Sequence, residues 1–89
     1  MIERAVQLEP KNAAFLDSLG WVLFKQNRPG EALAQLLRAI EYSTKPDATL
    51  YDHLGDIQAA LNQRDQAAEA WRKALAIGPN PQIQKKLDA

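Results

Sequence analysis

The sequence predicts an all-α fold in which antiparallel helix-turn-helix pairs stack side by side as a short α-solenoid. The first observation is an internal repeat: Leu16, Leu19, Gly20 and Leu23 return 35 positions later as Tyr51, Leu54, Gly55 and Gln58. The second is that apolar residues recur at helical spacing through most of the chain. The third is that Asn, Gly and Pro interrupt this spacing at regular intervals. Self-similarity at a period of this length is typical of stacked helical repeats.

Each copy of the pattern continues into a second segment that begins twelve residues after its glycine. There an alanine is followed by a bulky residue and then by another alanine. The repeated set is Leu19, Gly20, Ala32, Leu36 and Ala39 in the first copy, and Leu54, Gly55, Ala67, Trp71 and Ala74 in the second, which Pro79 closes. Ile2, Ala5 and Val6 stand 34 residues before Leu36, Ala39 and Ile40, so the end of an earlier copy is also present.

This pattern resembles the tetratricopeptide repeat (TPR) family, whose repeat has the form W-x2-L-G-x2-Y, then A-x3-F, then P. The resemblance covers nearly the whole chain. It departs from the family at the early Trp, replaced by Leu16 and Tyr51, and at the Tyr, replaced by Leu23 and Gln58. The resemblance implies a right-handed solenoid whose concave groove, lined by the first helix of each pair, binds a protein or peptide. Residues 17–24 are similar to repeats of long bacterial TPR proteins.

Length and composition limit the possible functions. Eighty-nine residues form one domain at most. Eleven basic and eleven acidic side chains give zero net charge, so we expect no bulk attraction to nucleic acid. Without cysteine there are no disulfides or thiolate metal sites. No apolar run approaches the roughly 18–20 residues of a spanning helix, so we expect no membrane insertion. The start has no signal-peptide shape, and cytoplasmic and periplasmic locations both stay open.

The repeat register divides the single domain, residues 1–89, into four parts. Residues 1–10 form the end of a preceding repeat or an N-terminal cap helix, residues 13–46 the first repeat, residues 48–79 the second, and residues 80–89 a C-terminal capping helix. In this register Met1 falls inside a second helix whose first-helix partner is missing. We therefore expect the chain to be a fragment of a longer repeat array.

Helix starts are predicted from residues that accept hydrogen bonds from the first free backbone N–H groups. Asn12 and Asp47 are expected to cap helices over about 13–26 and 48–61. Asp65 is expected to cap a helix over about 66–77. Asn80, followed by proline, is expected to begin a short helix that extends to about residue 87.

Helix ends are predicted from residues that favour turns. Asn27 and Asn62 occupy equivalent positions and tolerate a left-handed cap. Pro29-Gly30 is expected to lie in the turn before a helix over about 31–42. Gly78-Pro79 is expected to stop the last repeat helix.

Gly20 and Gly55 lie in the middle of predicted helices, where glycine costs about 1 kcal/mol relative to alanine. We interpret them as sites of close helix packing, with Ala32 and Ala67 as the partners across the contact. A phosphate-binding loop would require a preceding strand, which the sequence does not predict.

No set of residues predicts catalysis, and we expect neither enzyme activity nor a cofactor. His53 is the single histidine, and with Asp52 or Asp56 it gives too few ligands for a zinc site. We interpret it as a surface or groove histidine. No nucleophile, base and orienting group fall together in the repeat pattern.

The helix face turned away from the core offers candidate partner-binding residues. They are Asp17, Trp21, Phe24 and Lys25 in the first repeat and Asp52, His53 and Asp56 in the second. The large aromatics are typical interface anchors, although they could instead pack on an upstream or N-terminal helix. The three aspartates predict an acidic groove rim suited to Lys or Arg, or else they are simply solvated. The residues at the matching groove positions argue against a chaperone-type carboxylate clamp.

Two functions remain in competition. The first is a protein–protein interaction scaffold that presents its groove to a peptide or helix. The second is a self-association module, a homodimer or larger homo-oligomer formed through exposed repeat ends such as the stripe of Ile2, Ala5 and Val6. The partner and the biological process are not predicted from the sequence.

Overall fold

The computed structural model describes residues 12–45 and 47–88, and the segment predicted to end a preceding repeat, residues 1–10, lies outside them. The described part contains five α-helices and no strand. They are α2 (Ala13–Lys25), α3 (Pro29–Tyr42), α4 (Ala48–Ala60), α5 (Arg64–Ile77) and α6 (Pro81–Asp88). The predicted all-α fold is therefore confirmed.

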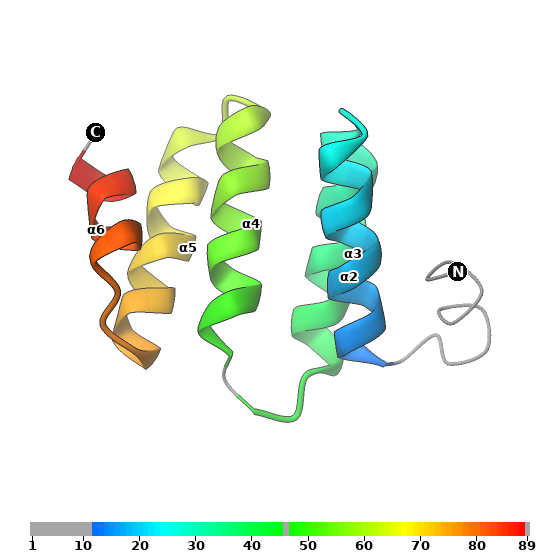
Figure 1. Ribbon diagram of the computed structural model, residues 1–89, viewed down its shortest axis with the longest axis horizontal. Coiled ribbons are helices and arrows are strands. Elements are labelled where there is room, and N and C mark those ends of the chain that lie inside the picture. Colours follow the sequence, from blue (N-terminus) through cyan, green and yellow to red (C-terminus); the bar gives the residue numbers. More distant parts are fainter. Residues whose placement is uncertain (1–11, 46, 89) are drawn as a thin grey trace.

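The helices form pairs that stack in chain order. α2 packs on α3 and α4 packs on α5, which are the two helix-turn-helix units. The pairs join through α3 and α4, and α6 lies against α5 at the end of the stack (Figure 1). α2 also contacts α4 directly, so the first helices of the two units share one side of the molecule.

Three helices begin at the polar residues that the sequence predicts. The Asn12 side chain accepts a hydrogen bond from the Phe15 backbone N–H at 3.2 Å. Asp47 accepts from Thr49 at 2.9 Å, and Asn80 accepts from Gln82 at 2.9 Å. Each bond satisfies one of the N–H groups that have no partner within the helix.

The turn inside each pair has the same backbone geometry, built on Asn27 and Asn62. Their φ angles are 62° and 63°, in the left-handed region that asparagine tolerates. The Asn27 N–H donates to the Phe24 carbonyl and the Arg28 N–H to the Leu23 carbonyl. The same two bonds recur one repeat later, at Asn62 and Gln63. This paired arrangement is the Schellman motif, and it reverses the chain in both units.

Two predicted boundaries are wrong. Pro29-Gly30 does not lie in the turn but opens α3, with proline at the first helical position. Proline fits there because the N–H group that it lacks would have no partner within the helix. Asp65 does not cap α5, because the helix already starts at Arg64, one residue before Asp65. Asp65 lies in the first turn instead, where its charge favours the positive end of the helix dipole.

The core is built mainly from leucines of the first unit and of α4. Leu16, Leu36 and Ile57 are completely enclosed, and they come from α2, α3 and α4 respectively. Burying such a side chain contributes about 1.5–3 kcal/mol. The buried face of α5 consists of Ala67, Ala70 and Ala74, whose small side chains allow close approach. Ile83 of α6 is 3% exposed and closes that end of the core.

Gly20 and Gly55 are buried where two helices of a pair come together. A Cβ atom on Gly20 would overlap the Leu36 side chain and lie 3.3 Å from the Ala32 carbonyl oxygen. A Cβ atom on Gly55 would overlap the Trp71 indole ring. The packing role holds, but the main partners are Leu36 and Trp71 rather than the two predicted alanines. The glycines make room for bulky residues that cross from the second helix of each pair.

Candidate functional site on the face of the first helices

The candidate partner-binding residues lie on α2 and α4, the first helices of the two units. We use the term first-helix face for the surface that they form together with Lys86 of α6. Its residues are Asp17, Trp21, Phe24 and Lys25 on α2, Asp52, His53 and Asp56 on α4, and Lys86 on α6. The ion pairs and ring contacts described below connect these three helices.

His53 and Asp17 join the two repeats. The His53 Nδ1 atom lies 2.8 Å from the Asp17 Oδ1 atom, across a sequence separation of 36 residues. Both side chains are mostly buried, at 20% and 18% exposure. A neutral imidazole must carry its proton on Nδ1 to donate this bond, which leaves Nε2 as an acceptor. Asp17 thereby fixes the orientation of the imidazole ring.

Trp21 lies beside this pair and is itself half-buried. Its ring stacks on the His53 imidazole, with centroids 4.2 Å apart and planes 22° from parallel. The Lys25 Nζ atom lies 5.0 Å from the Trp21 ring centroid. Trp21 is therefore in contact with the His53 imidazole and with the Lys25 ammonium group. Phe24 makes a tilted contact with Trp21 at 5.3 Å.

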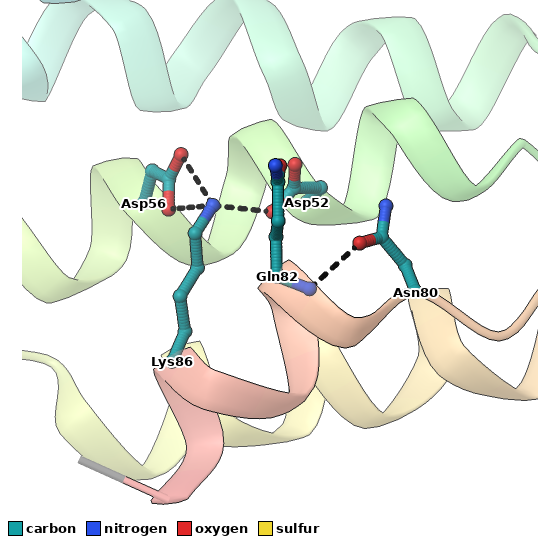
Figure 2. A network of polar contacts seen from close by, with 5 residues as sticks. All are labelled: Asp52, Asp56, Asn80, Gln82 and Lys86. Carbon is teal, nitrogen blue, oxygen red and sulfur yellow. Dashed lines mark hydrogen bonds and ion pairs between the residues drawn. The ribbon is translucent and has the colours of Figure 1, made fainter.

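Lys86 connects α6 to α4, as Figure 2 shows. Its Nζ atom lies 2.8 Å from an Asp52 carboxylate oxygen and 3.0 Å from an Asp56 carboxylate oxygen. Asp52 and Asp56 are four residues apart on α4, so both face the same side of the helix. One ammonium group therefore neutralises part of the charge of two carboxylates.

Both basic groups are held in their charged form more strongly than in water. Burial opposes the charged imidazole, but the bond to Asp17 and the carboxylates of Asp17, Asp52 and Asp56 together raise the pKa of His53 above its ordinary value of 6.5. Burial also opposes the charge of Lys86, but its bonds to Asp52 and Asp56 raise its pKa above 10.5.

The structure changes the interpretation of the predicted acidic rim. Asp17, Asp52 and Asp56 are neither free for a ligand nor simply solvated, because each is bonded to His53 or Lys86. Lys86 was not among the predicted site residues. The sequence did offer a clue to this contact, because Lys86 lies 34 residues after Asp52, about one repeat further along the chain.

Within residues 12–45 and 47–88, no group of three or more His, Cys, Asp or Glu side chains could hold a metal ion.

Gln58 replaces the usual aromatic residue of the repeat and is buried, at 9% exposure. Among the residues that the structure describes, neither its Oε1 atom nor the buried Nε1 atom of Trp71 has a hydrogen-bond partner. Gln58 lines a cavity of about 240 Å³ with the exposed Leu37 and with Lys73, whose Nζ atom lies 5.8 Å from the Tyr51 ring centroid. This cavity lies between α3, α4 and α5, and none of the residues of the first-helix face lines it.

In the part of the chain that the structure describes, no helix is both long and apolar enough to cross a membrane.

Comparisons with known proteins agree with the geometry. The type IV pilus assembly protein PilF of Pseudomonas aeruginosa is 28% identical over 78 residues, which cover 86% of this chain. The chain spans 31% of the length of that relative. The N-terminal domain of stress-induced protein-1 from C. elegans has a similar structure, with a TM-score of 0.84 and 22% identity. The match covers 98% of this chain and 73% of that domain, and it shows the fold alone.

Two family models match consecutive segments of the chain. Both are described as tetratricopeptide repeat, and they match residues 13–45 and 48–81. Each matched segment contains one helix pair, α2 with α3 and α4 with α5. Together the matches cover most of the chain. The chain therefore belongs to the tetratricopeptide repeat family.

Proposed function

We propose that this chain is a protein–protein interaction module whose first-helix face binds a peptide or helix of a partner. Tetratricopeptide repeats generally mediate protein–protein interaction and are typically scaffolds rather than enzymes. The observation that supports this face is the position of Trp21, a large half-buried aromatic among mixed charges. Aromatic residues held in this way are frequent binding hot spots.

The structure suggests how a partner would gain access to Trp21. One face of the indole is covered by His53, which is held in place by Asp17. Lys25 also lies over the indole ring, and the cation–π contact of this exposed side chain contributes about 0.5–1 kcal/mol at such a site. Displacing Lys25 is therefore the less costly route, and a partner that brings a cationic or aromatic group would replace that contact.

The paired carboxylates limit the negative charge that the first-helix face presents to a partner. Because Asp52 and Asp56 share Lys86 and Asp17 is bonded to His53, the face is not a strongly acidic one. Specificity would then rest on shape and on the aromatic anchor more than on net charge. The relative named for type IV pilus assembly makes a component of a protein assembly the first kind of partner to test.

Site-specific photo-cross-linking tests this proposal. Ser18 is exposed and lies three residues before Trp21, on the same helix face. A photo-reactive residue at Ser18 should capture a partner in cells, and Trp21→Ala should abolish the capture. The same residue at the exposed Arg72 of α5 is the matched control and should capture less. Equal capture from both positions, or none from Ser18, would count against the first-helix face.

Self-association is the second candidate. Leu37 on α3 is 50% exposed and borders the cavity that also contains Gln58. An exposed leucine beside a partly apolar cavity would suit contact with a second copy. Sedimentation against concentration distinguishes the two: a dimer that Leu37→Ser dissociates supports this candidate, and a monomer at all concentrations rejects it. The apolar stripe of Ile2, Ala5 and Val6 lies outside the described residues.

A further inference from the structure

His53 contacts two side chains whose interactions with the imidazole depend on its charge. Asp17, which accepts its Nδ1 bond, and Trp21, which stacks on its ring, both belong to α2, whereas His53 belongs to α4. One titratable side chain therefore connects the first helices of both repeats. It is also the single histidine in the chain, so no other side chain has an ordinary pKa in the same range.

The other charged groups around this contact come from every helix of the face. Asp52 and Asp56 on α4 add negative potential at the imidazole, more weakly than Asp17 does. Lys86 on α6 is held by these two carboxylates, which reduces their effect. Lys25 on α2 lies over the Trp21 ring, with its Nζ atom 5.0 Å from the ring centroid. The balance of these charges stabilises the imidazolium form of His53, because its nearest charged partner is the Asp17 carboxylate.

We propose that His53 is a proton-controlled clasp that fastens α4 to α2 and covers one face of Trp21 when it is charged. The proposal rests on the proposed function, because it concerns regulation of that same partner surface. In the charged state the contact with Asp17 is an ion pair with a hydrogen bond, and the contact with Trp21 is a cation–π stack. In the neutral state both weaken together, since the hydrogen bond to the Asp17 carboxylate loses its cationic donor and the stack loses its cation.

The clasp would control how much of Trp21 a partner can use. A partner that needs the indole face covered by His53 must displace the imidazole, and this displacement costs more when the imidazole is charged. Such a partner binds better above the pKa of His53 than below it. A partner that displaces only Lys25 is affected much less. The pH dependence of binding would therefore report whether a partner displaces the imidazole.

The first experiment follows the ring protons of His53 by NMR while the pH of the purified chain is varied. We expect the titration midpoint to lie above 6.5 and to fall in Asp17→Asn, which keeps the shape of the side chain but removes its charge. Asp52→Asn is the matched control, because Asp52 holds the same repeat position and bonds to Lys86 instead. It should lower the midpoint less. Identical midpoints in the wild type and Asp17→Asn would overturn the proposal.

The second experiment uses tryptophan emission and does not depend on how Asp17→Asn folds. A stacked imidazolium quenches indole fluorescence, so emission should rise as the pH passes upward through the His53 midpoint. His53→Gln should make emission independent of pH in this range. Trp21→Phe should remove the change, and Trp71→Phe should retain it. An emission change that persists in His53→Gln would overturn the proposal.

Both experiments need only the purified chain. A failure of the clasp would leave the cross-linking result untouched, and a failure of cross-linking from Ser18 would leave the titration of His53 untouched. The two proposals can therefore be judged separately.

Discussion

Asp17 and Asp52 occupy the same position in successive repeats, and each accepts a hydrogen bond from a basic side chain on the next helix of the first-helix face. Asp17 bonds to His53 of α4, and Asp52 bonds to Lys86 of α6, both at 2.8 Å. In both cases an aspartate is bonded to a basic side chain of a later helix, but the basic residue is histidine in the first case and lysine in the second. The first contact can be controlled by pH near neutrality, but the second cannot, because lysine titrates far higher.

The glycine contacts predict a ranked effect on stability. Gly55→Ala should destabilise the fold by about 1–3 kcal/mol, because the new Cβ meets the rigid indole of Trp71. Gly20→Ala should cost less, since the end of the flexible Leu36 side chain can move away. Gly30→Ala is the control, because no neighbouring atom of the described residues lies within 4 Å of its Cβ position. Urea unfolding of the three variants gives the order, and equal effects would reject this account of the packing.

The clasp also predicts how stability depends on pH. The pKa of His53 is raised in the folded chain, so the folded state binds its proton more tightly than the unfolded state. The stabilisation is fully present below 6.5 and is lost as the pH rises through the folded-state pKa. The free energy of unfolding should therefore decrease across this range in the wild type. In His53→Gln the decrease should be absent, and an unchanged slope would show that another group is responsible.

Lys86 should hold α6 in place. Lys86→Met keeps the aliphatic length but leaves Asp52 and Asp56 without their ammonium partner. We expect faster hydrogen exchange of α6 amides and a loss of up to about 1 kcal/mol, since the pair is partly exposed. Lys85→Met is the matched control, because Lys85 is the exposed neighbour on the same helix. Equal exchange in both variants would mean that Ile83 packing alone retains α6.

Most of the fold could be predicted because its signals are local. Asn12, Asp47 and Asn80 act on N–H groups two or three residues away, so spacing alone identifies them as caps. Asn27 and Asn62 adopt a backbone conformation that few other residues tolerate. The predictions failed where two local preferences competed. Proline, for example, suits both a turn and the first helical position, and α3 uses the second.

The candidate site was harder to predict because its contacts cross from one repeat to another. Helical spacing places Asp17, Trp21 and His53 on exposed faces, but it does not determine which rings stack or which carboxylates are paired. These depend on the distance and rotation between α2 and α4, which are set by the packing of Leu16, Leu36 and Ile57. The Lys86 contact depends similarly on where Ile83 places α6. Which charged side chains pair at the site therefore depends on how the core residues position the helices.

The measurement that tests the central claim most directly compares Trp21→Ala with Trp71→Ala. Binding of the partner captured from Ser18 and the thermal unfolding of each variant would be measured together. The account predicts that Trp21→Ala loses the partner and stays folded, whereas Trp71→Ala loses stability because its ring fills the space at Gly55. Retained binding in a folded Trp21→Ala variant would contradict the account. Unfolding of Trp21→Ala would equally contradict it, because Trp21 would then belong to the core.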